Sequence, residues 1–139
     1  MKKKSYEIIE HTADIGIRVR GKDFKELLER AALAMFDIIA KKKKVPTSTE
    51  QANIELKAQN RDELFVNWLN ELLSLSATKE IIFTDFKFSK LTENELEVIA
   101  QGESNNNYRV NVEIKAATYH QLKIEETKQG WLAEVIFDV

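Results

Sequence analysis

The stretch IGIRVRGKDFKELLERAALAMFDIIA, residues 15–40, changes its hydrophobic period after Gly21. Up to that glycine, apolar and charged side chains alternate, so that Ile17 and Val19 share one face and Arg18 lies on the other. Such alternation predicts a half-buried strand. Beyond the glycine, apolar side chains recur at the spacing of a helix face: Phe24, Leu27, Leu28, Ala31, Met35, Ile38 and Ile39. A strand followed directly by an amphipathic helix is therefore the first predicted unit.

Both predicted helices begin at capping residues. Asp23 is the predicted N-cap of the first helix, with Glu26 three residues later, and Asn60 with Glu63 marks the start of the second. The second helix, residues 60–78, has an apolar face formed by Phe65, Trp68, Leu69, Leu72 and Leu73. The lysine run at 41–44 is predicted to end the first helix, because cations are favoured at helix C-termini.

The rest of the sequence alternates in hydrophobicity and predicts strands. They cover residues 6–10, 52–58, 81–91, 95–103, 107–118, 120–126 and 131–139. The strand at 107–118 is expected to place Val110 and Ile114 on one face. Short turns at 92–94 and 127–130 join neighbouring strands, and short connections favour antiparallel pairing. The predicted fold class is therefore α+β, a largely antiparallel sheet with two amphipathic helices packed on it.

The last predicted strand, residues 131–139, is apolar on both faces. Val135 and Phe137 lie on one face, and Leu132 and Ile136 lie on the other. A strand that is covered on both sides is typical of the interior of a sheet. We therefore expect this strand to be central.

Composition sets limits on the class of protein. With 139 residues, the chain is expected to form one domain over residues 1–139. Apolar residues make up 43% and charged residues 32%, a balance that excludes a disordered chain. The formal net charge of -2 predicts no strong attraction for nucleic acid, and the lack of cysteine excludes disulfides and zinc-thiolate sites. The longest uncharged apolar run, residues 31–36, is far short of the roughly 18 residues of a membrane span, so a cytoplasmic protein is expected.

The segment EHTAD, residues 10–14, interrupts the first two predicted strands. It gathers His11, one of only two histidines, with the carboxylates of Glu10 and Asp14. Aspartate often bonds the amides of a turn, so a purely structural turn is one interpretation. A binding site is the other.

The end of the last strand carries a second group of carboxylates. The side chain of Asp138 and the α-carboxylate of Val139 lie one residue apart. Anions held together repel one another, and a hard divalent cation relieves that repulsion. A third carboxylate from elsewhere would complete a ligand set suited to Ca²⁺, Mg²⁺ or Mn²⁺. The alternative interpretation is a solvated chain end.

Two other polar residues have both a structural and a functional interpretation. His11 either orders its turn by hydrogen bonding or belongs to a site, but it has no zinc-ligand partner at helical spacing. Lys115 falls on the polar face of the strand predicted at 107–118, where a surface ion pair is the ordinary role.

Three segments together resemble the archease family. They are EHTADIGIRVRGKDFKELLERAALAMFDII, LFVNWLNELL, and EIKAATYHQLKIEE followed by GWLAEVIFDV. The segments span nearly the whole chain in the order of the family. The resemblance implies the archease fold, a strand-helix-strand-strand module with a helical insertion.

The resemblance also implies a function. Archeases are partners of the RtcB-type RNA-splicing ligase, which uses GTP and Mn²⁺ to join RNA ends in tRNA splicing and RNA repair. The archease promotes guanylylation of the ligase and its multiple turnover, and thus acts as a protein cofactor rather than an enzyme. Contact with tRNA, other RNA and GTP is then expected only through the ligase.

Residue by residue, the resemblance implies a metal site made of Asp14, Asp138 and Val139. The ion implied is calcium, with Mn²⁺ or Mg²⁺ as alternatives, and Lys115 is a further functional candidate. Two other functions stay open for such a chain: a chaperone or specificity modulator of a tRNA-modifying enzyme such as a methyltransferase, and a metal-dependent phosphoester hydrolase.

Overall fold

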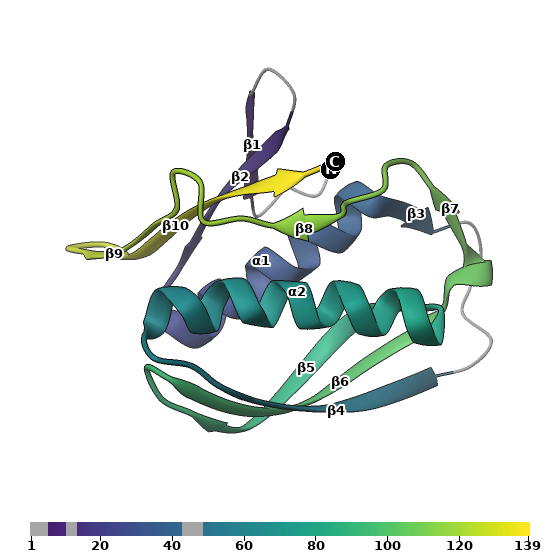
Figure 1. The fold of residues 1–139 in the computed structure, drawn as a ribbon, viewed down its shortest axis with the longest axis horizontal. Coiled ribbons are helices and arrows are strands. Elements are labelled where there is room, and N and C mark those ends of the chain that lie inside the picture. The colour runs from purple at the N-terminus through teal and green to yellow at the C-terminus, as the bar shows by residue number, and fades with distance from the viewer. Residues whose placement is uncertain (1–5, 11–13, 43–48) are drawn as a thin grey trace.

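The computed structural model describes residues 6–10, 14–42 and 49–139 (Figure 1). Its elements in chain order are β1 (Tyr6–Glu10), β2 (Ile15–Gly21), α1 (Phe24–Ile39), β3 (Ala40–Lys42), β4 (Thr49–Lys57), α2 (Arg61–Lys79), β5 (Ile81–Leu91), β6 (Glu95–Ser104), the 3₁₀ turn η1 (Asn105–Asn107), β7 (Tyr108–Val110), β8 (Ala116–Ala117), β9 (Lys123–Thr127) and β10 (Gly130–Asp138). The predicted α+β class is confirmed.

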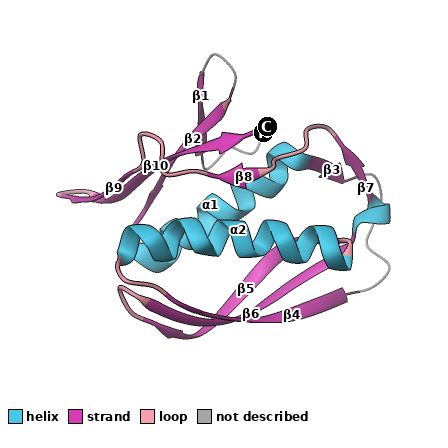
Figure 2. Cartoon of the chain, viewed as in Figure 1, coloured by secondary structure: helices cyan, strands magenta, loops and turns pink. Residues whose placement is uncertain are grey.

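The strands of the described ranges form three sheets in which every pair is antiparallel. One sheet has the order β1-β2-β10-β8, with β9 also paired to β10; a second has the order β4-β6-β5; and β3 pairs with β7. Figure 2 shows α1 and α2 as a middle layer between the first two sheets. The apolar helix faces are therefore covered from two sides.

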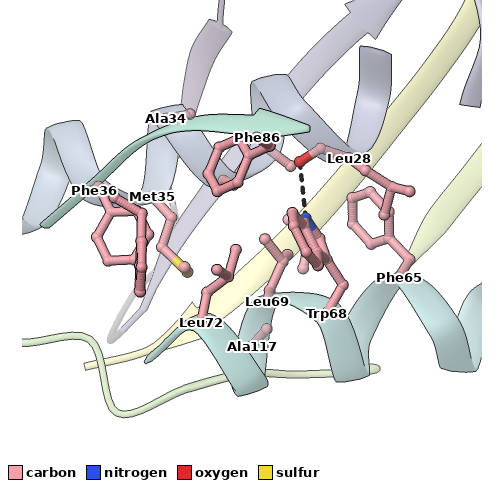
Figure 3. Close-up of a cluster of buried hydrophobic side chains, with 14 of the residues drawn as sticks. Leu28, Ala34, Met35, Phe36, Phe65, Trp68, Leu69, Leu72, Phe86 and Ala117 are labelled. Carbon is pink, nitrogen blue, oxygen red and sulfur yellow. Dashed lines mark hydrogen bonds between the residues drawn. The ribbon is translucent and has the colours of Figure 1, made fainter. Parts of the chain in front are cut away.

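The core lies in this middle layer, and Trp68 of α2 is at its centre (Figure 3). The indole is fully buried, and its Nε1 donates a hydrogen bond of 2.9 Å to the main-chain oxygen of Leu28 on α1. The ring of Phe86 on β5 packs edge-on against the indole, with ring centroids 5.3 Å apart. A buried tryptophan needs such a partner for its N–H, and this bond joins the two helices.

Both predicted helix caps are confirmed. Asp23 accepts a hydrogen bond from the main-chain nitrogen of Glu26 at 2.9 Å, and Asn60 accepts one from that of Glu63 at 2.9 Å. Each glutamate in turn accepts a bond from the main-chain nitrogen that precedes the cap. These reciprocal bonds satisfy donors that a helix start would otherwise leave unpaired.

The lysine run does not end α1, so that prediction was wrong. The helix stops at Ile39, and Ala40 is already extended with φ -150° and ψ 152°. Lys41 and Lys42 lie in β3, which pairs with β7. Pairing with a second strand thus outweighs the weak preference of lysine for a helix C-terminus.

The predicted strand at 107–118 was wrong in its length and in its apolar face. The structure has β7 and β8 at its two ends and no strand at 111–115. Val110 is 64% exposed, whereas Ile114 is buried. The two ends pair with different sheets, β7 with β3 and β8 with β10, and the chain between them must cross from one sheet to the other.

The central position predicted for the last strand is confirmed. β10 pairs with β2 along one side and with β9 and β8 in succession along the other. Its residues 132, 133 and 135–137 are all buried. Within the described ranges, no helix is long and apolar enough to cross a membrane.

Candidate functional site at the end of β10

Asp14 immediately precedes β2, in the segment that connects β1 to β2 in their hairpin. The hairpin register runs from Tyr6 opposite Val19 to Glu10 opposite Ile15. The side chain of Asp14 is half-buried. His11, the other candidate of this segment, lies outside the described residues, as do the two residues that follow it.

The register between β2 and β10 brings the start of one strand beside the end of the other. The last pair of this ladder is Ile15 opposite Phe137. Asp14 directly precedes Ile15 in the chain, and Asp138 directly follows Phe137. Residues directly opposite in an antiparallel pair present their side chains on the same face. The ladder thus brings the start of β2 near the end of β10, although Asp14 and Asp138, which adjoin its last pair, are 124 positions apart in the sequence.

The other side of β10 brings Lys115 to the same end. β8 pairs with β10 through Ala117 opposite Phe137 and Ala116 opposite Asp138. The main-chain nitrogen of Lys115 then donates a hydrogen bond of 2.8 Å to the main-chain oxygen of Asp138. The side chain of Lys115 is exposed. Its predicted place on the face of a continuous strand was wrong, because residues 111–115 form no strand.

Asn70 of α2 fixes β8, although no motif in the sequence pointed to this residue. Its side-chain Oδ1 accepts a 2.7 Å bond from the nitrogen of Ala117, and its Nδ2 donates a 3.1 Å bond to the oxygen of the same residue. Thr118 follows, with both its nitrogen and its hydroxyl donating to the oxygen of Ile136. The only sign in the sequence was an amide beside the apolar face of a predicted helix.

The donor set at this end is oxygen-rich and open to solvent. Asp138 and Val139 are exposed, with Val139 at 37%. In the described part of the chain, no three histidine, cysteine, aspartate or glutamate side chains are grouped so as to hold a metal ion. The set implied by the resemblance has only two acidic side chains, Asp14 and Asp138, and takes its third oxygen donor from the main chain. Carboxylate oxygens of this kind suit a hard cation such as Ca²⁺.

Comparison with known proteins places this fold in a family. Residues 6–139 match the model of the Archease protein family (MTH1598/TM1083). Proteins named "Protein archease" from Methanosarcina barkeri and Pyrococcus furiosus are 41% and 34% identical to the chain; each alignment covers 98% of the chain, and 97% and 99% of the relative, respectively.

Two solved structures share the fold at 28% sequence identity. The solution structure of Methanobacterium thermoautotrophicum protein 1598 has a TM-score of 0.75 and covers 99% of this chain and 100% of its own. The crystal structure of a Thermotoga maritima archease, described as a possible chaperone, has a TM-score of 0.67 and covers 100% of this chain and 98% of its own. The chain belongs to the archease family.

Proposed function

We propose that this chain activates an RtcB-type RNA-splicing ligase, promoting its GTP-dependent guanylylation and its multiple turnover in tRNA splicing or RNA repair. Family membership supports the proposal. The observation that carries it is the register of β10, whose end pairs with Ile15 at the start of β2 on one side and bonds to Lys115 on the other. This register supports the proposal because it brings segments that are distant in the sequence to one end of a central strand, where a partner could contact them.

The proposed ligands of a divalent ion are the carboxylates of Asp14, Asp138 and the chain end at Val139. Calcium is the first choice, with Mn²⁺ and Mg²⁺ as alternatives, because all three are hard ions that prefer carboxylate oxygen. When bound, the ion supplies a local positive charge, which favours an approaching phosphate. The exposure of Asp138 and Val139 leaves room for a partner at this end.

Lys115 supplies a second positive charge under this proposal. Its main chain is held to β10 by the bond to Asp138, while its side chain extends into solvent. Its ammonium group can donate to phosphate oxygens of GTP bound in a docked ligase, which is how phosphoryl-transfer sites generally neutralise charge. The chain itself forms no covalent bond with the nucleotide: it positions charge, and the ligase carries out the chemistry.

The experiment is a turnover assay with purified ligase, GTP, Mn²⁺ and an RNA with joinable ends, scored as ligations per ligase molecule. Wild-type chain should raise this number above one, and Asp14→Ala and Asp138→Ala should each abolish the increase. Asp85→Ala removes an exposed carboxylate on β5 and is the matched control. Full stimulation by both site variants would reject the proposed role of these residues.

A second candidate is a chaperone-like partner of a tRNA-modifying enzyme. The observation that favours it is the description of the Thermotoga maritima archease as a possible chaperone. Pull-down with a ligase and with a tRNA methyltransferase, each with and without EDTA, separates the two candidates. Chelator-sensitive capture of the ligase supports the first, and chelator-insensitive capture of the methyltransferase supports the second.

A further inference from the structure

A second surface feature lies at the opposite end of β10. A cavity of about 510 Å³ opens where the starts of α1 and α2 meet the β5–β6 turn and the β9–β10 hairpin. Residues of all four parts line it, among them Phe24, Arg61, Leu91, Glu93, Glu126 and Trp131. Trp131 and Asp138 are seven residues apart on β10, a separation of roughly 23 Å along a strand. The cavity is therefore distinct from the candidate metal site.

The floor of this cavity is aromatic and held in place. The rings of Phe24 and Trp131 have centroids 6.0 Å apart. The guanidinium of Arg61 lies 5.1 Å from the centroid of the Trp131 ring, and its Nη2 donates a 3.2 Å bond to the main-chain oxygen of Ile124. A cation over an aromatic face is favourable, so Arg61 is fixed as part of the wall.

A second hollow of about 560 Å³ adjoins the first. It shares Arg61 and Glu93 with the first cavity and adds Asp62, Glu63 and Tyr119 to the lining. The side chain of Tyr119 is 55% exposed. We call the two adjoining hollows the Arg61 groove. It has an apolar half at Trp131 and a polar half at Tyr119.

The rim of the Arg61 groove is acidic. Five carboxylates line it, from Asp23, Asp62, Glu63, Glu93 and Glu126, against two cations, Lys25 and Arg61. Asp23 and Glu63 are engaged at the starts of the two helices. The other three carboxylates are exposed and make no hydrogen bond or ion pair with the residues that the structure describes.

The electrostatics of the polar half agree with an acidic rim. The pKa of the Tyr119 phenol is raised, first by partial burial and then by the carboxylates of Glu63 and Asp62. The N-termini of α1 and α2 do not offset the negative potential of these carboxylates. The side chains of Asp23 and Asn60 already accept hydrogen bonds from the main-chain N–H groups there, which would otherwise attract an anion. Phosphate groups are therefore repelled, and a cationic ligand is attracted.

We propose that the Arg61 groove docks a segment of a partner protein in which lysine or arginine flanks an apolar side chain. The apolar side chain packs against Phe24 and Trp131, and the flanking cations pair with Asp62, Glu93 and Glu126. Charge complementarity and the aromatic floor select this occupant over nucleic acid. The proposal goes beyond the activation proposed above and does not depend on it.

Trp131 reports directly on the groove. The chain has two tryptophans, and the other, Trp68, is fully buried with its Nε1 bonded to Leu28. In ¹⁵N-labelled protein, a capped peptide of two arginines flanking two leucines should shift the Trp131 indole signal and leave the Trp68 signal in place. A peptide with glutamate in place of arginine and a short single-stranded oligouridylate are the competing probes. An equal or larger shift with either would overturn the proposal, as would no shift with the basic peptide.

Charge reversal tests the acidic rim. The double variant Glu93→Lys with Glu126→Lys should bind the basic peptide at least about fivefold more weakly, the effect expected for two exposed charge pairs. The matched control, Glu50→Lys with Glu55→Lys, makes the same change in charge at exposed positions of β4 and should bind as wild type does. Thermal melting checks that both variants fold. Binding by the groove variant within about twofold of the control would contradict the proposal.

Discussion

The side chain of Asn70 and the main chain of Ala117 are joined by two hydrogen bonds, one in each direction, of 2.7 and 3.1 Å. This pair ties α2 to β8 across 47 positions of sequence. β8 is only two residues long, so few ladder bonds could hold it. The Asn70 amide therefore helps to decide where Lys115 stands relative to the end of β10.

Asn70→Ala should lower the free energy of unfolding by about 1–3 kcal/mol, because the main-chain donor and acceptor of Ala117 lose their part-buried partner. Urea denaturation measures this change, and faster amide exchange at 115–118 should accompany it. Asn67→Ala, in the same helix, is the control, since the side chain of Asn67 makes no hydrogen bond with the described residues. Equal changes in the two variants would show that the Asn70 pair does not hold β8.

Lys115→Ala should abolish most of the stimulation of ligase turnover while the free energy of unfolding changes by less than about 0.5 kcal/mol. The side chain is exposed, and surface substitutions of this kind are usually nearly neutral for stability. Lys87→Ala on β5 also removes an exposed lysine and should leave stimulation intact. The turnover assay and a urea melt are run on the same preparations. Stimulation that survives in Lys115→Ala would remove this residue from the proposed mechanism.

Extending the chain by three glycines after Val139 should weaken calcium binding by at least about tenfold. Losses of metal affinity of this size are typical when a group that supports a metal site is removed. The extension displaces the terminal carboxylate but leaves Asp14 and Asp138 in place. An amidated Val139 removes the charge without adding residues and serves as the companion variant. Isothermal titration with Ca²⁺ measures both. Unchanged affinity in the two proteins would exclude the main-chain carboxylate as a ligand.

Glu29 on α1 gives a pH-dependent prediction. Its pKa is raised, chiefly by partial burial and further by Glu26, Asp85 and Asp23, while Lys25 opposes the shift. A carboxyl whose folded pKa lies above its unfolded value contributes stability below the unfolded pKa and loses it as pH rises through the folded one. Glu29→Gln should therefore raise the melting temperature at pH 7 and make no difference near pH 3. A gain that is equal at both pH values would contradict this account.

The sequence predicted those parts of the fold whose signals are local. Asp23 and Asn60 begin helices because their side chains bond nitrogens three residues away. The apolar character of both faces of β10 likewise indicated its central place. For residues 107–118 the prediction was wrong, because the alternation of apolar and polar side chains cannot reveal that β7 and β8 pair with different sheets.

The candidate site was predictable in composition and unpredictable in arrangement. The carboxylates of Asp14 and Asp138 could be singled out as unusual from sequence alone. The positions of these two residues in the fold depend on the register of β2 with β10, a long-range property that residue spacing does not encode. The role of Asn70 depends on the same kind of contact between segments remote in the chain.

The central claim is that the start of β2 and the end of β10 hold one divalent ion between them. Anomalous diffraction from crystals soaked in Mn²⁺ tests it most directly. We predict a peak that contacts carboxylate oxygens of Asp14, Asp138 and Val139, and that disappears in Asp138→Ala. Two ligands of one such ion lie within about 5 Å of each other. A peak elsewhere, or carboxylates of Asp14 and Asp138 set farther apart than that in the soaked crystal, would contradict the claim.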